Sequence, residues 1–225
     1  MSKVKLFPTS SSLWRVGGID CTSILRNARN KEKQGLWAEA CDTRAEAAQM
    51  IIDAADDEAI RLDWEDENSR NALQIIYQSA ADYLSVGEVE TATALWESVI
   101  DFDEEDHLQA TMMLAFCYVE LEDFECLETV MSDISPKSAE YHLLTLWAEY
   151  RHTKGVDRDA LRTLRTRHKA WYEEFIAPEH PADEEFLADR QRERPQPRTE
   201  SREFWFATES IWMRNADFIS ALIKA

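Results

Sequence analysis

A spaced pattern of small residues and turns recurs along the chain and restricts the folds that it can adopt. Residues 80–89 align with residues 115–124 at an offset of 35, and a tyrosine follows three residues after each leading alanine. A turn position comes seven residues after the small residue, and a second Ala or Leu comes five residues later. Four copies are present: Ala28, Gly35 and Ala40; Ala80, Gly87 and Ala92; Ala115, Glu122 and Leu127; Ala148, Gly155 and Ala160.

The residues around these turns have the periodicity of amphipathic helices. Apolar side chains recur at intervals of three and four, as at Val89, Ala92, Trp96 and Val99. A small residue lets two helices approach closely, and each helix pair leaves an apolar side exposed until another pair stacks on it. The pattern therefore predicts an all-α fold of stacked antiparallel helix pairs, with strands plausible only at residues 4–7 or 14–16. An ordinary, non-repeating helical bundle is the alternative.

This spacing resembles the tetratricopeptide repeat (TPR), whose signature is W-x2-L-G-x2-Y followed by A, F and P. Tyr83 and Tyr118 match the signature tyrosine, and Ala92 matches its alanine. The leading Trp is missing, Glu122 stands at a turn glycine, and the first two copies are 52 residues apart. The resemblance covers residues 21–171 and implies a TPR-like α-solenoid.

Proline, glycine and charge divide the chain into four segments. Residues 1–20 are expected to be extended, and residues 21–176 to form the TPR-like helical-repeat domain. Four of the six prolines fall in residues 177–200, which read as a flexible loop rich in proline and charge. A last amphipathic stretch, residues 201–225, is expected to be a C-terminal capping helix packed on the repeats.

The TPR resemblance implies an inner groove lined by the first helix of each pair. Transferring that geometry places eight residues on a partner-binding groove: Gln74, Tyr77, Gln109, Met112, Phe116, Glu120, His142 and Glu149. The same face includes Leu84, Thr145 and His152. Aromatic and Met side chains on a groove suit an apolar peptide anchor. The alternative for Tyr77, Met112 and Phe116 is core packing.

Some TPR domains capture a C-terminal carboxylate with Lys and Asn at matching groove positions. In this chain those positions hold Leu25, Arg29, Ala81, Gln109 and Met113, which include a single base. The resemblance therefore does not imply a carboxylate clamp.

Acidic residues are concentrated in the middle of the chain. The formal net charge is −19, and residues 71–136 hold fifteen Asp and Glu but no Lys or Arg. Such a block favours a basic partner, although a solvated acidic surface that keeps the protein soluble is the alternative. The acidic face is expected to comprise Asp101, Asp103, Glu104, Glu105, Asp106, Glu122, Asp123 and Glu125.

Composition and motifs exclude several classes of protein. Five glycines leave little room for a Rossmann fold or a phosphate loop, and the acidic balance argues against a nucleic-acid binder. The sequence has no apolar run long enough for a membrane span and no signal-peptide core. The four cysteines have no metal or redox spacing. We therefore expect a cytoplasmic protein with no membrane or nucleic-acid partner.

The sequence has no recognisable catalytic or metal-binding pattern. His142 and His152 share a helix with Glu149, but ten residues of helix span about 15 Å, too far for two ligands of one ion. No nucleophile elbow, H-E-x-x-H or deaminase signature is present. We expect no catalytic, cofactor or metal site, and hence no enzyme.

The sequence thus favours a protein–protein interaction module, an adaptor or scaffold that binds a partner protein or peptide through a helical groove and an acidic face. The partner is expected to have a basic surface. Two alternatives remain: an acidic immunity or inhibitor protein that occludes a basic toxin or nuclease, and an enzyme of unrecognised class.

Overall fold

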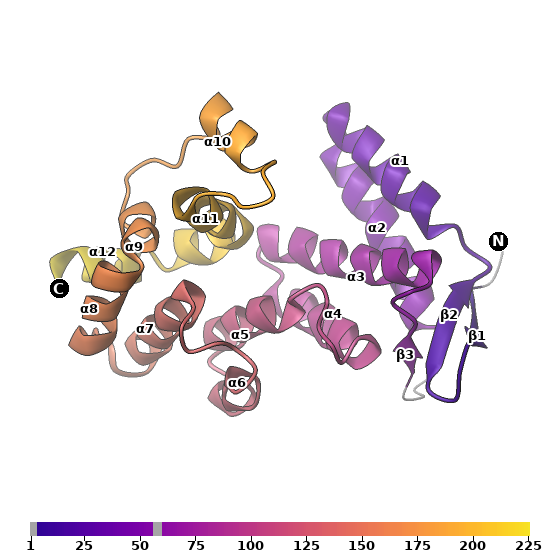
Figure 1. Ribbon diagram of the computed structural model, residues 1–225, viewed down its shortest axis with the longest axis horizontal. Coiled ribbons are helices and arrows are strands. Elements are labelled where there is room, and N and C mark those ends of the chain that lie inside the picture. Colours follow the sequence, from indigo (N-terminus) through magenta and orange to yellow (C-terminus); the bar gives the residue numbers. More distant parts are fainter. Residues whose placement is uncertain (1–3, 56–59) are drawn as a thin grey trace. The chain divides into compact units, whose positions relative to one another are not determined.

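The computed structural model describes residues 4–55 and 60–225, and most of these residues are helical (Figure 1). They form two compact units: an N-terminal unit (Met1–Leu84 and Glu88–Cys117) and a C-terminal unit (Ser85–Gly87 and Tyr118–Ala225). The helices are α1 (Cys21–Lys33), α2 (Trp37–Ile52), α3 (Glu67–Ser85), α4 (Val89–Phe102), α5 (Ala110–Leu121), α6 (Phe124–Met131), α7 (Ala139–Thr153), α8 (Arg158–Arg167), α9 (Lys169–Phe175), α10 (Glu184–Asp189), α11 (Pro197–Arg214) and α12 (Ala216–Lys224).

A small sheet in the N-terminal unit modifies the expected all-α fold. Strands β1 (Lys5–Pro8) and β2 (Leu13–Gly17) form an antiparallel hairpin, and β3 (Arg61–Leu62) pairs with β2 in parallel. The hairpin covers both stretches where the sequence allowed a strand. The Asn68 side chain donates to the carbonyl oxygens of Val16 and Ile19, so the start of α3 holds the end of β2.

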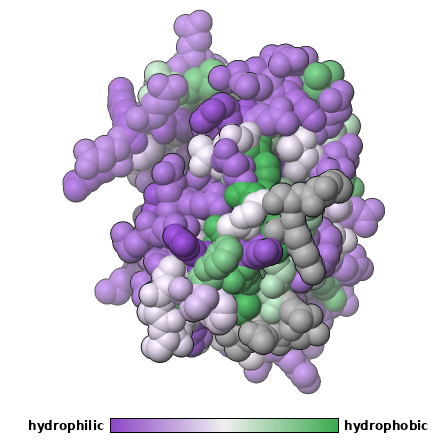
Figure 2. All heavy atoms as spheres, turned by 90° about the vertical axis from the view of Figure 1, so that its right-hand side faces the viewer, coloured by the Kyte–Doolittle hydropathy of each residue, from purple (hydrophilic) through white to green (hydrophobic). Residues whose placement is uncertain are grey.

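Hydrophilic side chains cover most of the face shown in Figure 2, and hydrophobic side chains gather in a narrower band at its centre. Among the described residues of the N-terminal unit, the exposed large hydrophobic side chains are Phe7, Leu36 and Trp37. Single exposed apolar side chains of this kind are common on protein surfaces.

Four pairs of consecutive helices, from α1–α2 to α7–α8, correspond to the four copies of the sequence pattern. The turns contain residues in the left-handed region, at Gly35, Gly87, Glu122 and Lys154, with φ of 75°, 87°, 59° and 59°. The first three are the turn positions of the pattern. In the fourth turn the left-handed residue is Lys154 and not the neighbouring Gly155, whose φ is outside this region.

The long interval between the first two copies has a structural cause. Residues 53–66 separate α2 from α3, and they include β3, which adds a strand to the sheet. The later connections between pairs, residues 103–109 from α4 to α5 and residues 132–138 from α6 to α7, are half as long. An insertion that builds part of the sheet therefore lengthens the spacing from the first copy to the second.

The N-terminal unit buries a charged side chain among its helices. Arg44 on α2 is 4% exposed, and its guanidinium donates to Asp82 on α3 at 2.7 and 2.9 Å and to Glu32 on α1 at 2.5 Å. Burial acts to lower the pKa of Arg44, but these hydrogen bonds outweigh it and raise the pKa. Arg44 therefore links three helices as a cation.

Aromatic packing dominates the C-terminal unit. Trp212 on α11 lies 5.0 Å from Trp147 on α7, 5.3 Å from Phe175 on α9 and 6.0 Å from Phe218 on α12, measured between ring centroids. Edge-to-face and tilted pairs of this kind add to the stability gained by burial.

The last segment of the chain forms two helices, α11 and α12, where the sequence predicted one capping helix.

The proline-rich segment at residues 177–200 is held by specific contacts. It contains α10, which begins after Asp183, whose carboxylate accepts from the backbone N–H of Phe186 at 2.9 Å. His180 stacks on Trp205 with ring centroids 3.9 Å apart. Arg202 on α11 donates to the carbonyl oxygen of Pro181 at 2.9 Å. These contacts hold the segment against α11. The sequence pattern predicted a flexible loop here and did not predict the contacts.

Candidate functional site

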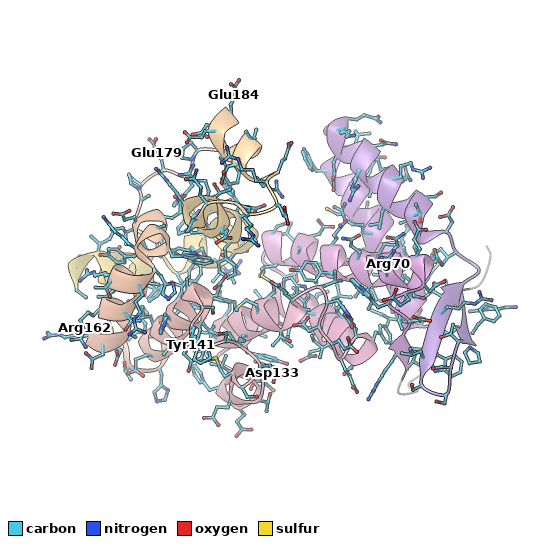
Figure 3. All side chains as sticks on the ribbon, in the orientation of Figure 1. Arg70, Asp133, Tyr141, Arg162, Glu179 and Glu184 are labelled. Atoms are coloured by element: carbon cyan, nitrogen blue, oxygen red, sulfur yellow. The ribbon has the colours of Figure 1, made fainter. Side chains whose placement is uncertain are left out.

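An open groove between α6 and α7 in the C-terminal unit, here called the α6–α7 groove, is the site that best fits partner binding. It has a volume of about 390 Å³. The α6 side contributes Phe124, Leu127, Glu128 and Met131; the α7 side contributes Tyr141, Leu144, Thr145, Ala148, Glu149 and His152. Figure 3 labels Tyr141 on α7 and Asp133 just after α6, which locate the two helices.

The sequence of α6 places three apolar side chains on the groove. Phe124, Leu127 and Met131 are three and four residues apart, so they share one face of the helix. Asp123 fixes the start of α6, because its carboxylate accepts a hydrogen bond from the backbone N–H of Cys126 at 3.0 Å.

Helix α7 has two faces with different roles. Ser138 caps its start, accepting from the backbone N–H of Tyr141 at 3.1 Å. One face buries Leu143, Leu146, Trp147 and Tyr150. The other face lines the groove with the half-buried Ala148, beside Leu144, which is fully buried beneath the surface. The small side chain of Ala148 leaves space that a larger residue would fill.

The floor of the α6–α7 groove is apolar and its edges are polar. Leu127 is 6% exposed and Leu144 is fully buried, while Met131 is half-buried. The Phe124 and His152 rings meet edge to face, with centroids 5.6 Å apart. Such a surface can accept apolar side chains of another molecule.

Uncompensated acids surround this floor. Glu128 and Glu149 line the groove, and Glu125 is exposed on the same helix as Glu128. Within residues 4–55 and 60–225, none of these three carboxylates has an ion-pair partner within 4.0 Å. The groove therefore presents negative charge to whatever binds it.

The eight predicted groove residues fall in different units. Glu149 lies on the α6–α7 groove together with Thr145 and His152. Gln74, Tyr77, Gln109, Met112 and Phe116 belong to the N-terminal unit, and Glu120 and His142 to the C-terminal unit.

Glu120 is engaged by its own unit. Its carboxylate pairs with Arg214 at 3.0 Å, accepts from the Asn215 amide at 2.7 Å and lies 3.8 Å from the Arg151 guanidinium. Glu120 thus joins α5, α7 and the end of α11. The sequence predicted a partner contact for this residue, and the structure shows an internal one.

His142 lies apart from the groove, beside His168. The two rings have centroids 5.4 Å apart. Burial lowers the pKa of His142, and the nearby His168 and Arg167 lower it further. The His142 side chain therefore favours its neutral form.

In the N-terminal unit, the two predicted aromatic groove residues differ in burial. Phe116 is fully buried, so core packing, the alternative that the sequence left open, describes it. Tyr77 is half-buried and meets Trp96 edge to face at 5.9 Å, and burial together with Asp106 raises the pKa of Tyr77 to about 12. Met112 is half-buried, and Gln109 is exposed with a φ of 56° just before α5.

Several members of the predicted acidic face have structural partners. Asp103 is buried and accepts from the backbone N–H and the Nδ1 of His107. Asp106 accepts from the N–H groups of Ala110 and Thr111 at the start of α5. Asp123 caps α6, as described above.

The rest of the predicted acidic face lies at the surface. Glu104 pairs with Arg61, Glu122 pairs with Arg151 at 2.8 Å, and Glu105 lies 3.3 Å from His107. Asp101 and Glu125 are exposed. The acidic stretch thus mixes helix caps and internal pairs with carboxylates that face solvent.

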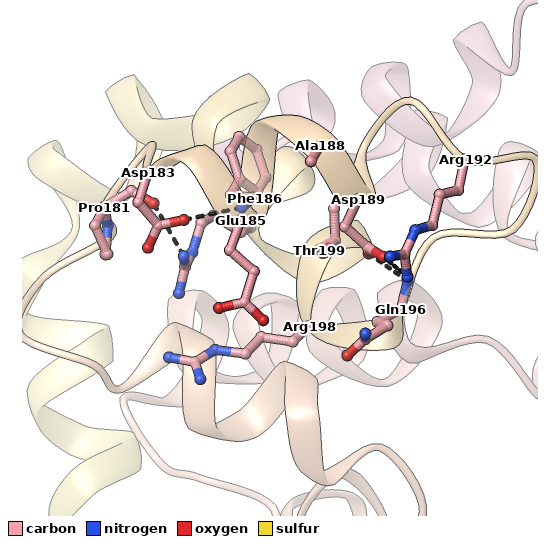
Figure 4. Close-up of a pocket in the computed structure, with 11 residues that line it drawn as sticks. Pro181, Asp183, Glu185, Phe186, Ala188, Asp189, Arg192, Gln196, Arg198 and Thr199 are labelled. Carbon is pink, nitrogen blue, oxygen red and sulfur yellow. Dashed lines mark hydrogen bonds and ion pairs between the residues drawn. The ribbon is translucent and has the colours of Figure 1, made fainter.

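A second cavity, between α10 and α11, is occupied by interactions within the protein (Figure 4). Asp189 accepts from the backbone N–H of Gln196 at 2.7 Å and pairs with Arg192 at 2.8 Å. The hydrogen bonds from Gln196 and Thr199 lower the pKa of Asp189. Its charged groups therefore hold α10 against α11.

The groove expected from the sequence included Thr145, Glu149 and His152 but not the other residues that line the α6–α7 groove. Leu127 and Ala148 were expected only as members of the repeat pattern. Glu149 comes close to α6 only in the folded chain, so the available signal was the pair Glu125 and Glu128 beside the apolar stripe of Phe124, Leu127 and Met131.

No family model, curated protein or solved structure matches the chain. Across the described part of the chain, no group of three or more His, Cys, Asp or Glu side chains is arranged to hold a metal ion. In the same residues, no helix combines the length and apolar character needed to cross a bilayer.

Proposed function

We propose that this protein is a protein-binding adaptor, and that the α6–α7 groove takes a basic amphipathic helix of a partner protein. The observation that carries the proposal is the combination of an apolar floor with acids at its edges, Glu128 and Glu149, that have no ion-pair partner among the described residues. A helix with apolar residues at intervals of three, four and seven places one stripe on such a floor. Lys and Arg beside that stripe would meet Glu128 and Glu149.

The size of the groove limits how much of a partner it engages. Helix α6 has eight residues, so its length is about 12 Å. This corresponds to roughly two turns of a partner helix. Shape and apolar contact then supply affinity, while the carboxylates select the charge of the partner and speed its association.

We also propose that the four helix pairs are degenerate TPR-like repeats that stack as a solenoid. The left-handed residues at Gly35, Gly87 and Glu122 support this, because they recur at the turn positions of the pattern. Ala28, Ala80 and Ala115 support it as well, since at most 1% of each is exposed.

Binding is tested with a fluorescein-labelled helical peptide of Leu and Lys in amphipathic order, followed by fluorescence anisotropy. We expect the wild-type protein to bind it and to bind the corresponding Leu–Glu peptide far more weakly. The variant Thr145→Arg with Ala148→Arg fills the floor and adds positive charge, so its affinity is expected to fall roughly tenfold or more. Arg is a good helix former, so α7 is retained.

A matched control separates the groove from total charge. Thr166→Arg with Ser220→Arg adds the same charge at exposed positions of the same unit, and it should bind the Leu–Lys peptide like the wild type. Equal loss in both double variants, or equal affinity for the two peptides, would contradict the proposal.

A further inference from the structure

The N-terminal unit has a polar groove between α1 and α3, here called the α1–α3 groove, with a volume of about 340 Å³. Three bases line it from α1, namely Arg26, Arg29 and Lys33, and three amides line it from both helices, namely Asn30, Asn71 and Gln74. This surface is basic in a protein whose net charge is −19.

Hydrogen bonds fix α1 and α3 beside one another. The Cys21 N–H donates to the side-chain oxygen of Asn68 at 2.9 Å, and the Asn71 amide donates to the Thr22 hydroxyl at 2.8 Å. Both bonds join the first turns of the two helices, so the helices start at the same end of the groove. The two helices that form its walls are therefore held together at their first turns.

The three bases form one stripe, in which Arg26 also interacts electrostatically with Asp20. They are three and four residues apart on α1, so they project from one face of the helix. All three are exposed, and none of them has an ion-pair partner within 4.0 Å in the described residues. By contrast, their neighbour Lys31 lies 3.6 Å from Glu39.

The acid that lines this groove, Glu67, does not neutralise the stripe. It is the first residue of α3 and so lies at the joined end of the two helices. Lys33 is the last residue of α1, and a helix of 13 residues is about 20 Å long. The positive charge therefore increases away from Glu67.

The donors fit carboxylates. A guanidinium presents paired N–H groups that match a carboxylate, and amide NH₂ groups add neutral donors. We propose that the α1–α3 groove binds an acidic segment of a partner protein through its Asp and Glu side chains. This goes beyond the proposed function, because it assigns a second surface with a partner of the opposite charge.

Charge favours a short acidic segment over a nucleic acid. At an ionic strength of about 0.15 M the Debye length is about 8 Å, so contacts inside the groove persist while more distant acids are screened. A nucleic acid would extend its phosphates beyond the three bases, where the net charge of −19 repels them. A segment whose carboxylates match the stripe avoids that repulsion.

The test uses a fluorescein-labelled peptide of alternating Glu and Ser, acetylated and amidated so that it has no terminal carboxylate. Anisotropy is measured with the full chain at about 0.15 M salt. We expect binding to the wild type, and a loss of roughly tenfold or more in Arg29→Glu with Lys33→Glu. The control Lys137→Glu with Arg158→Glu makes the same change in net charge at exposed positions of the other unit and should bind normally.

A single-stranded oligonucleotide and phosphatidylserine vesicles are measured in parallel with the same variants. The proposal is overturned if the Glu–Ser peptide fails to bind, or if the groove variant and its control lose affinity equally. It is also overturned if the oligonucleotide or the vesicles bind through Arg29 and Lys33 more tightly than the peptide. Circular dichroism confirms that both double variants keep the helical content of the wild type.

Discussion

Each of the two compact units buries one arginine against carboxylates, but the two environments differ. Arg44 in the N-terminal unit meets Glu32 and Asp82, whose side chains are 28% and 23% exposed. Arg202 in the C-terminal unit meets Glu174, whose side chain is 1% exposed, at 2.7 and 3.0 Å. The same residue type thus pairs with partly exposed carboxylates in one unit and with a buried carboxylate, which His180 also contacts, in the other.

The two grooves differ in a parallel way. The α6–α7 groove has an apolar floor with acids at its edges, and the α1–α3 groove has polar walls with three bases that make no ion pair within the described part of the chain. The groove in the C-terminal unit is therefore negatively charged, and the groove in the N-terminal unit is positively charged. The net charge of −19 therefore agrees in sign with the α6–α7 groove but not with the α1–α3 groove.

The largest expected effect concerns the two arginines. Arg202→Met leaves the Glu174 carboxylate buried without its guanidinium, and we expect a loss of about 3–5 kcal/mol in unfolding free energy. Arg44→Met leaves two carboxylates that water reaches, so we expect a loss of about 1–2 kcal/mol in unfolding free energy. Urea unfolding followed by tryptophan fluorescence measures both.

A double variant checks the cause of this difference. Glu174→Gln in the Arg202→Met background removes the buried charge that has lost its guanidinium partner and keeps only His180 and Arg198 nearby, so part of the lost stability should return. If Arg44→Met lowers the unfolding free energy as much as Arg202→Met does, then the exposure of the partner carboxylates does not decide how much stability a buried arginine contributes.

The second prediction concerns acid. Burial acts to raise the pKa of Glu174, but the hydrogen bonds from Arg202 and His180 outweigh it and hold the pKa below its ordinary 4.5. Arg198 also faces this carboxylate, at 3.7 Å. Because the folded value is the lower one, the stabilisation is complete above about pH 4.5 and is lost as the pH falls through the folded value.

Unfolding free energies of the wild type and Glu174→Gln, measured from neutral pH into acid, test this sign. The wild type should be the more stable at neutral pH, and the gap should narrow in acid. A gap of constant size would show that ionised Glu174 does not stabilise the fold.

The third prediction, which includes the smallest expected effect, compares alanines at equivalent positions of the pattern. Ala80 is fully buried, so Ala80→Met should overpack the N-terminal unit and cost about 1–3 kcal/mol. Ala148 is half-buried and faces the open α6–α7 groove, so Ala148→Met should change stability by about 0.5 kcal/mol or less. Thermal unfolding of both variants gives the comparison, and equal destabilisation would mean that the groove is closed in solution.

The helices and their turns were largely readable from the sequence. Apolar spacing of three and four located the helix pairs, and the glycines at residues 35 and 87 marked two turns, where φ is positive. Local backbone preference and hydrophobic periodicity act within a few residues, so they are visible in a single sequence.

The candidate site was less predictable. Phe116 and Phe124 both lie on apolar helical stripes, yet Phe116 is fully buried and Phe124 lines an open groove. Which stripe is covered depends on segments far away in the chain. The pattern of one helix does not contain that information.

The amino-acid sequence by itself determined a mainly helical chain, its helix-pair turns and its acidic middle, because periodicity, turn chemistry and charge are local properties. Tertiary structure decided which charges are free. It directed Glu120 to Arg214 and Asn215 and buried Glu174 against Arg202, while Glu128 and Arg29 received no ion-pair partner among the described residues. The physical reason is that desolvation and pairing depend on which distant side chains arrive beside a charge.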